Sequence, residues 1–264
     1  MLRTVFVILS LTIASFSFAQ EINQTDAQGR KQGLWVKKYP DGTIMYEGNF
    51  KDGKPTGMMK RYFETGELKA EMDFSEDGSS AYTKMFYQNG DLAAEGELVR
   101  GEKNGPWKYY SFYDKKLTAE ENYVKGVKEG VEKKYYADGQ LAEITNWQNG
   151  KKHGPWKQYY ENGQVKSESS FTNGEINGEY TVYLENGMPE VKGTYNMGRM
   201  DGTWFYYDEN GQVERDLAFE NGKPLNEDKL TEEEREFFEL IEKNKGKFDE
   251  PSIEDFVMPG NRQN

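Results

Sequence analysis

The sequence predicts an all-β protein: an elongated, single-layer antiparallel β-meander of about eight hairpin repeats with a short C-terminal α-helix. Three observations lead to this prediction. Glycine recurs with a period of 24 residues, Asn-Gly and Asp-Gly pairs recur within that period, and 14% of the chain is aromatic although only 35% is hydrophobic. The 28 glycines and the scarcity of aliphatic residues suit a thin, turn-rich sheet. The 18 Tyr, 15 Phe and 5 Trp are too many aromatic residues for a disordered chain.

The first nineteen residues are typical of a secretory signal peptide. Arg3 precedes the apolar run 5–13, and Ser17 and Ala19 provide the small residues of a cleavage site before Gln20. The apolar run is short for a membrane-spanning helix, and an uncleaved anchor is the alternative. We therefore expect a periplasmic or extracellular protein after cleavage near Ala19–Gln20. The chain has no cysteine and no disulfide, so its fold must depend on repetition and packing.

The charge of the chain excludes two classes of partner. The net charge is −12, the isoelectric point is near 4.8 and the mean hydropathy is −0.96. Nucleic acids and anionic membrane surfaces both require a basic protein surface. We therefore expect neither of them as the main partner.

A frame that begins at Gly33 and advances by 24 residues defines eight repeats. The repeats begin at Gly33, Gly57, Ala81, Gly105, Gly130, Gly154, Gly178 and Gly202, with one residue inserted before Gly130. We number the first residue of each repeat as position 0. Glycine then recurs at position 9, where Asp114 is the exception. It also recurs at position 20, where Gly78 stands one place late. Such a period is typical of arrays in which each repeat packs against its neighbours. We expect residues 20–32 to form a partial repeat or N-terminal strand, and residues 33–224 to form the array.

The residues before these glycines predict the turns. Asn or Asp precedes position 9 at Asp41, Asn89, Asp138, Asn162, Asn186 and Asn210, and precedes position 20 at Asp52, Asn149, Asn173 and Asn221. Both pairs indicate two-residue type I′ hairpin turns, whose two central residues have positive φ. Each repeat is thus expected to contain two strands, which gives about sixteen in all.

A two-residue turn at positions 8 and 9 pairs residues whose positions sum to 17. This register sets Lys60 opposite Glu71, Lys84 opposite Glu95 and Lys157 opposite Glu168. It places positions 3, 14 and 16 on a charged face, and it collects the aromatic and aliphatic residues of positions 2, 6, 11 and 17 on the other face.

The repeat consensus, clearest in GPWKQYYENGQVKSESSFTNGEING from Gly154 to Gly178, resembles the MORN repeat variant family (membrane occupation and recognition nexus). Bacterial proteins with this repeat often carry the name toxin–antitoxin system YwqK family antitoxin. The resemblance covers residues 29–224, and the motif recurs in phase eight times. It implies an elongated single-layer β array without catalytic residues.

After Pro224 the repeat pattern ends. Thr231 and Glu234 have the spacing of a helix capping box, and Phe237, Phe238 and Ile241 form one apolar stripe. We expect a helix within residues 225–247 that caps the array, with docking to another protein as the alternative. Residues 248–264 are expected to form an acidic flexible tail or to fold back partly on the array.

No motif for catalysis, a cofactor or a metal was found, and we expect a non-enzymatic protein. One histidine and no cysteine argue against Cys–His nucleophiles and common zinc sites. We expect His153 to be a solvated loop residue. The carboxylates that recur opposite lysines are expected to form a structural ladder.

Position 5 is the candidate binding site, because it places an aromatic column on the charged face: Tyr62, Phe86, Tyr110, Tyr135, Tyr159, Tyr183 and Tyr207. These rings either pack between repeats or offer a ladder of contacts to a long ligand. The function we expect is an exported scaffold that binds a protein partner. The alternatives are a glycan-binding accessory module and an antitoxin-like or immunity-like inhibitor of another protein.

Overall fold

The computed structural model describes residues 21–232, 235–236, 239–240 and 243. The expected signal peptide and the acidic tail lie outside the described residues. The chain divides into two compact units, residues 1–151 and residues 152–264. Each unit is described by itself below.

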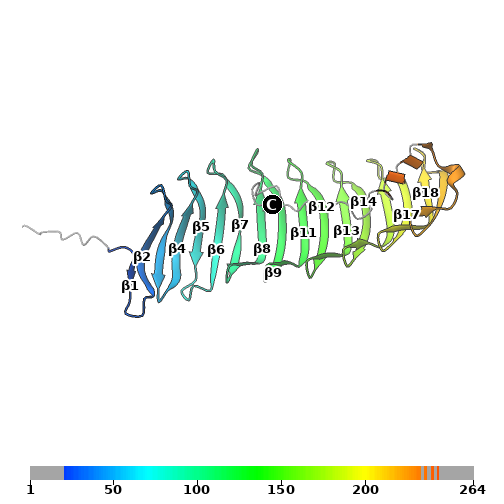
Figure 1. Cartoon of the computed structure of the whole chain (residues 1–264). Coiled ribbons are helices and arrows are strands. Elements are labelled where there is room, and N and C mark those ends of the chain that lie inside the picture. The colour runs from blue at the N-terminus through cyan, green and yellow to red at the C-terminus, as the bar shows by residue number, and fades with distance from the viewer. Residues whose placement is uncertain (1–20, 233–234, 237–238, 241–242, 244–264) are drawn as a thin grey trace, which may run out of the picture. The chain divides into compact units, whose positions relative to one another are not determined.

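The first unit contains twelve strands within its described residues (Figure 1). They are β1 (Gln24–Thr25), β2 (Lys31–Lys38), β3 (Ile44–Lys51), β4 (Lys54–Tyr62), β5 (Leu68–Phe74), β6 (Ser80–Phe86), β7 (Leu92–Val99), β8 (Glu102–Tyr110), β9 (Leu117–Val124), β10 (Val127–Lys128), β11 (Gly130–Tyr135) and β12 (Leu141–Gln148).

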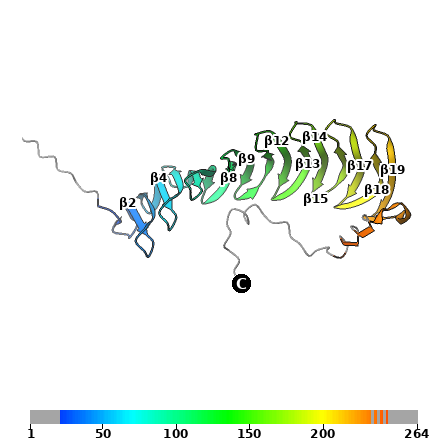
Figure 2. The ribbon, with the colours of Figure 1, turned by 90° about the horizontal axis from the view of Figure 1, so that it is seen from above.

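The second unit contains β13 (Lys151–Tyr159), β14 (Val165–Thr172), β15 (Glu175–Ile176), β16 (Gly178–Tyr183), β17 (Pro189–Asn196), β18 (Arg199–Tyr207), β19 (Val213–Glu220), β20 (Lys223–Pro224) and the 3₁₀ turn η1 (Glu227–Lys229). In each unit the strands pair antiparallel with their chain neighbours and form a single layer (Figure 2). Apart from the two-residue segments β1, β10, β15 and β20, the described strands number sixteen. The predicted all-β hairpin meander is confirmed.

The turns at positions 19 and 20 are type I′, as predicted, except in the second repeat, where Ser75 and Ser80 enclose a longer loop in which only Gly78 has positive φ. Asp52 and Gly53 have φ of 52° and 81°, and the flanking Lys51 and Lys54 pair with each other. The same conformation occurs where the sequence lacks Asn or Asp, at Arg100 (φ 53°) and Met197 (φ 46°). The turn type therefore depends on the glycine and the strand twist more than on the preceding residue.

The predicted two-residue turn at positions 8 and 9 is wrong. Positions 7 to 9 form a three-residue loop: the Phe63 amide donates to the Glu67 carbonyl (2.9 Å), and the Gly66 amide donates to the Phe63 carbonyl (3.0 Å). Gly66 has φ of 99°. The Asn and Asp residues that precede the other glycines at position 9 do not have positive φ. At Asp41 the side chain accepts the Thr43 amide instead (2.9 Å). This is a type I turn with a glycine bulge.

The predicted register holds over most of each hairpin. Lys60 pairs with Glu71, Lys84 with Glu95 and Lys157 with Glu168. Near the loop the extra residue is absorbed by a bulge at position 12, so Tyr62 lies opposite Leu68. The prediction placed position 11 with position 6, on the face away from position 5. That placement is wrong, because Leu68 at position 11 pairs with Tyr62 at position 5 and therefore lies on the same face as Tyr62.

The glycine at position 0 also marks a bulge. Between Gly48 and Asn49 the pairing of β3 with β4 shifts, and Gly57, at the shift, has φ of 59°. Ala81 cannot adopt such a φ cheaply, and β5 pairs with β6 there without any shift. The missing glycine of the third repeat thus corresponds to a regular pair of strands.

The core of each unit lies on the aromatic face of the sheet. In the first unit Trp107, 1% exposed, packs with Ala94 and Tyr123. Its ring covers Gly96 of the neighbouring strand so closely that a Cβ at Gly96 would lie 2.5 Å from the indole. The glycine therefore provides the space for the tryptophan.

Residues that follow the last repeat pack against its core. Leu230, 7% exposed, packs with Trp204, Leu217 and Phe219 of the last repeat. The Arg235 amide donates to the Thr231 carbonyl (3.1 Å), which is the first hydrogen bond of a helix after Thr231. Phe237, Phe238 and Ile241 lie outside the described residues.

Candidate binding surfaces

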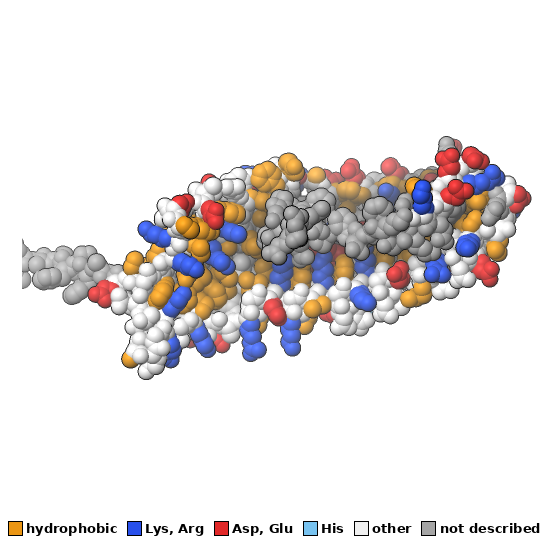
Figure 3. Space-filling model, viewed as in Figure 1, with side chains coloured by type: hydrophobic (Ala, Val, Ile, Leu, Met, Phe, Trp, Pro, Cys, Tyr) orange, Lys and Arg blue, Asp and Glu red, His pale blue; other side chains and the backbone are white. Residues whose placement is uncertain are grey.

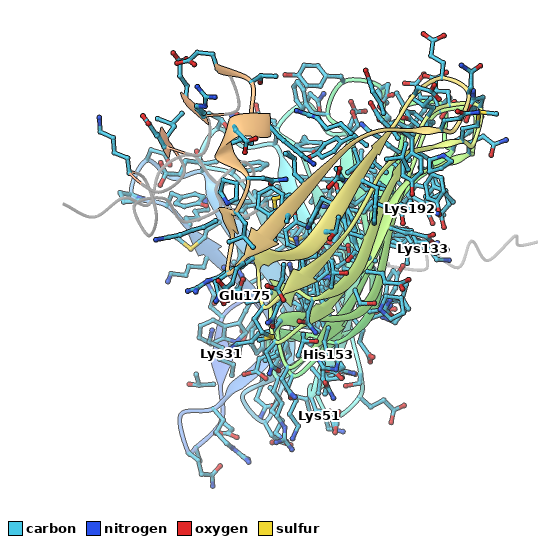
Figure 4. All side chains as sticks on the ribbon, turned by 90° about the vertical axis from the view of Figure 1, so that its right-hand side faces the viewer. Lys31, Lys51, Lys133, His153, Glu175 and Lys192 are labelled. Atoms are coloured by element: carbon cyan, nitrogen blue, oxygen red, sulfur yellow. The ribbon has the colours of Figure 1, made fainter. Side chains whose placement is uncertain are left out.

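Each unit presents two different faces. In the first unit Lys133 and Lys31 lie on opposite sides of the ribbon (Figure 4). Lys133 belongs to the charged face and Lys31 to the aromatic face. His153 is exposed, as expected, but it lies in β13 rather than in a loop.

The hydroxyls of four column tyrosines bind the preceding repeat. The acceptors are carboxylates fifteen residues earlier in the chain: Tyr62 donates to Glu47 (2.6 Å), Tyr110 to Glu95 (2.7 Å), Tyr135 to Glu120 (2.8 Å) and Tyr183 to Glu168 (2.6 Å). Glu168 also accepts the Lys157 ammonium at 2.8 Å. Each such carboxylate thus joins two repeats.

The electrostatics of these contacts follow from burial and from the carboxylates. Burial and the Glu47 acceptor raise the pKa of Tyr62 to about 12. Burial and the matching Glu95 and Glu120 acceptors raise the pKa of Tyr110 and Tyr135 to about 12 as well. At Tyr183 the hydrogen bond to Glu168 is the main cause of a raised pKa. The tyrosines are thus held neutral, as hydrogen-bond donors.

The remaining column residues are half-buried as well. They are Phe86, Tyr159 and Tyr207. The hydroxyls of the four tyrosines with carboxylate acceptors are therefore engaged within the array. This arrangement favours packing between repeats for those four residues.

Beside the tyrosines, the charges of the first unit alternate along one row across the strands. Strand pairing sets the following residues side by side: Glu47, Lys60, Glu71, Lys84, Glu95, Lys108, Glu120 and Lys133. Lys60 and Glu71 are 3.6 Å apart and partly exposed. Such pairs contribute little to stability, but together they make the row electrically neutral.

An exposed apolar row runs next to these charges, at position 1. Met58 is 47% exposed, Tyr82 51% and Val131 39%. The exposed acidic residues Asp73 and Glu97 pair across the strands with Met58 and Tyr82. We call Met58, Asp73, Tyr82, Glu97, Pro106 and Val131 the outer row. The sequence reasoning missed it, because position 1 carries a different residue type in each repeat.

A hollow of about 310 Å³ lies at one end of the outer row. Pro106, Asn122 and Val131 line it, together with Lys108, Glu120 and Lys133 of the charged row. Asn122 is held in place, because its side-chain amide donates to the Val131 carbonyl (2.8 Å).

The aromatic face carries lysines that the sequence reasoning also missed (Figure 3). In the first unit the Lys31 ammonium lies 4.5 Å from the Trp35 ring centroid and donates to the Tyr46 hydroxyl (2.8 Å). Lys103 lies 4.9 Å from the Tyr123 ring and donates to the Tyr109 hydroxyl (2.9 Å). The recurrence of lysine two residues before a repeat, at Lys31, Lys103, Lys128 and Lys152, is the signal that could have shown these cation–π contacts.

One buried ionic cluster interrupts this face. Glu121 and Glu132 are each 3% exposed, and Lys128 donates to both, at 2.7 Å and 3.0 Å. Glu121 also accepts the Tyr123 hydroxyl, and Glu132 accepts the Trp147 indole N–H (2.8 Å). Burial alone would raise the pKa of Glu121, but Lys128 and Tyr123 outweigh it and lower that pKa.

Among the described residues, no group of three or more His, Asp or Glu side chains could hold a metal ion. Within the same part of the chain, no helix is both long and apolar enough to cross a membrane.

The fold and these surfaces define a repeat protein built from single-layer β-hairpins. The family model of the MORN repeat variant matches residues 31–52, 55–76, 128–149, 152–173, 176–197 and 200–221, half of the chain. The chain belongs to the MORN repeat variant family. Repeats of this family are commonly modules that bind proteins or membranes. The unmatched interval contains the three departures from the glycine pattern, Ala81, Asp114 and the displaced Gly78, although β6–β7 and β8–β9 form hairpins there.

No curated protein matches the chain. The crystal structure of TarM is similar over 51% of this chain and 19% of its own, with 15% identity and a TM-score of 0.22. The crystal structure of the GtfA/B complex is similar over 50% of this chain and 20% of its own, with 16% identity and a TM-score of 0.21. The crystal structure of TcdB2-TccC3-TEV is similar over 75% of this chain and 12% of its own, with 12% identity and a TM-score of 0.20. The chain thus spans a fifth or less of these proteins, and scores this low do not bear on its function.

Proposed function

We propose that this protein is an exported, non-enzymatic scaffold that binds a protein partner through the charged face of its sheet. The observation that carries the proposal is the outer row, where Met58, Tyr82 and Val131 expose 39–51% of their surface among polar neighbours. Exposed apolar side chains aligned along one face favour a protein contact over a solvated surface. Tyrosine in particular is enriched among residues that dominate binding energy.

The aromatic column has a supporting role in this proposal. The hydroxyls of Tyr62, Tyr110, Tyr135 and Tyr183 are already engaged by carboxylates. We therefore assign these four residues to the attachment of one repeat to the next, and the outer row to contact with the partner.

Photo-crosslinking tests the binding surface. A benzophenone amino acid replaces Tyr82 in one variant and Tyr113 in another, and both variants are expressed in the native host. Tyr113 is the matched control, because it is 93% exposed at a hairpin loop away from the outer row. We expect a discrete crosslinked partner from position 82 only. Equal crosslinking from both positions, or none from position 82, contradicts the proposal.

Export is tested separately. The proposal places the cleavage after Ala19, so the protein recovered from the periplasm or the medium should begin at Gln20. Protein that remains in the cytoplasm with Met1 at its N-terminus would contradict export and leave the binding surface to be judged by crosslinking.

A further inference from the structure

The spacing of the outer row restricts the conformation of its partner, an inference that rests on the proposed protein-binding function. Met58, Tyr82, Pro106 and Val131 occupy position 1 of four consecutive repeats in the first unit. Consecutive repeats lie two strands apart, and neighbouring strands lie about 4.8 Å apart, so these side chains recur about every 9.6 Å.

A polyproline II segment laid across the strands matches this spacing. It has three residues per turn and rises 3.1 Å per residue, so every third side chain faces the sheet about every 9.3 Å. Over the three intervals from Met58 to Val131 the mismatch accumulates to about 1 Å. Side chains of such a segment would therefore stay in phase with the whole row.

The other regular conformations fit less well. In an α-helix, residues seven apart face the same side, and they are separated by about 10.5 Å. Relative to the spacing of the outer row, this mismatch accumulates to about 3 Å over the same three intervals. A β-strand presents one side about every 6.7 Å and falls out of phase within one repeat. The row therefore selects the polyproline II conformation.

The charges of the outer row indicate which residues the bound segment should contain. Asp73 lies between Met58 and Tyr82 in the paired strands, and Glu97 pairs with Tyr82 on its other side. Both carboxylates are exposed, and within the described part of the chain neither side chain has a hydrogen bond or ion pair. The adjacent charged row is balanced and adds no net charge. A segment with Lys or Arg beside its apolar residues complements this pattern.

We propose that the outer row binds a basic, proline-rich segment of a partner protein in the polyproline II conformation, with an apolar side chain at every third position. The exposed Tyr82 ring provides the aromatic surface on which proline packs. The hollow between Pro106 and Val131 receives one apolar side chain at the end of the segment.

Peptide binding tests the proposal. The probe is a fluorescein-labelled peptide of four Leu-Pro-Lys triplets, titrated with the purified protein and followed by fluorescence anisotropy. Three control peptides are a scrambled order, an acidic version with Glu in place of Lys, and a helix-forming peptide with Leu every seventh residue. We expect each control to bind at least about tenfold more weakly. A control that binds as tightly as the probe, or a probe that does not bind, overturns the proposal.

Variants locate the binding. Tyr82→Ser should weaken probe binding at least about tenfold, and Asp73→Asn with Glu97→Gln should weaken it and reduce its dependence on salt. Phe205→Ser is the matched control, because Phe205 is 38% exposed and belongs to the second unit. Circular dichroism shows whether each variant folds. Equal losses in Tyr82→Ser and Phe205→Ser would overturn the proposal.

The two proposals fail separately. A protein crosslinked from position 82 together with a probe that does not bind overturns the polyproline II segment and leaves the scaffold function standing. Absence of any crosslinked protein overturns the scaffold function itself.

Discussion

The hydroxyl of Tyr183 donates a hydrogen bond of 2.6 Å to Oε1 of Glu168, a residue of the preceding repeat. The other oxygen of Glu168 lies 2.8 Å from the Lys157 ammonium on the opposite strand of its own hairpin. One carboxylate therefore holds a hairpin together and attaches it to the next. Lys157 and Tyr183 lower the pKa of Glu168, so the carboxylate stays ionised at neutral pH.

The first prediction removes this hydrogen bond. Tyr183→Phe keeps the ring and leaves the carboxylate with one partner, so it should lower the free energy of unfolding by about 1 kcal/mol. Urea denaturation measures the change. Tyr113→Phe is the control and should have no effect, since Tyr113 is 93% exposed. Equal changes in the two variants would show that the Glu168 contact does not stabilise the array.

Alkaline pH provides the second prediction. The pKa of Tyr62, Tyr110 and Tyr135 is about 12 in the folded protein, against an ordinary value of 10.0. Between these values the unfolded chain has lost protons that the folded protein retains, so stability should fall as the pH rises from 10 to 12. Urea midpoints of the protein and of a variant with Phe at all three positions measure the effect. The Phe variant should lose less stability over this range; identical pH profiles would argue against the shifts.

A third prediction concerns the pair Gly96 and Trp107. Gly96→Ala places a methyl group against the indole and should cost about 1–3 kcal/mol, and Trp107→Ala should cost about 3–5 kcal/mol. In the double variant the alanine no longer meets a ring, so the loss should be smaller than the sum. Strictly additive losses would contradict the close contact between the two residues.

The fourth prediction concerns the buried ionic cluster. Lys128→Met leaves Glu121 and Glu132 buried without their cation and should cost about 3–5 kcal/mol at pH 7. Glu121 has a lowered pKa, so its contribution is lost as the pH falls below the ordinary value of 4.5. The cost of Lys128→Met should therefore be smaller at pH 4. The control Lys60→Met, at an exposed ion pair, should cost under about 1 kcal/mol. A cost that does not change with pH would be the contrary result.

The sequence predicted those features that depend on recurrence. The period, the Lys–Glu register and the turns at position 20 follow from glycines and charges that return in phase, and the structure has all three. The loop at position 9 could not be predicted in the same way, because Asn-Gly is compatible with a type I′ turn and with a type I turn followed by a glycine bulge. Only the hydrogen bonds at Phe63, Gly66 and Glu67 distinguish the two.

The candidate site shows the limit of recurrence more clearly. The column at position 5 was visible because tyrosine repeats, and four of its hydroxyls bind carboxylates. The outer row was hidden because Met58, Tyr82, Pro106 and Val131 share no residue type. Glu121 and Glu132 were hidden because each is an exception in its repeat, and their burial depends on a single lysine from β10.

The most direct test of the central claim measures melting temperature and partner recovery on the same preparations of two double variants. Met58→Ser with Tyr82→Ser removes the exposed contacts of the outer row, and Tyr135→Phe with Tyr183→Phe removes two hydrogen bonds between repeats. We predict that the first variant loses the partner and melts close to the unmodified protein, whereas the second melts earlier and keeps the partner. Full partner recovery by the first variant, with loss of the partner in the second, would contradict the assignment of the outer row to binding and of the tyrosine column to stability.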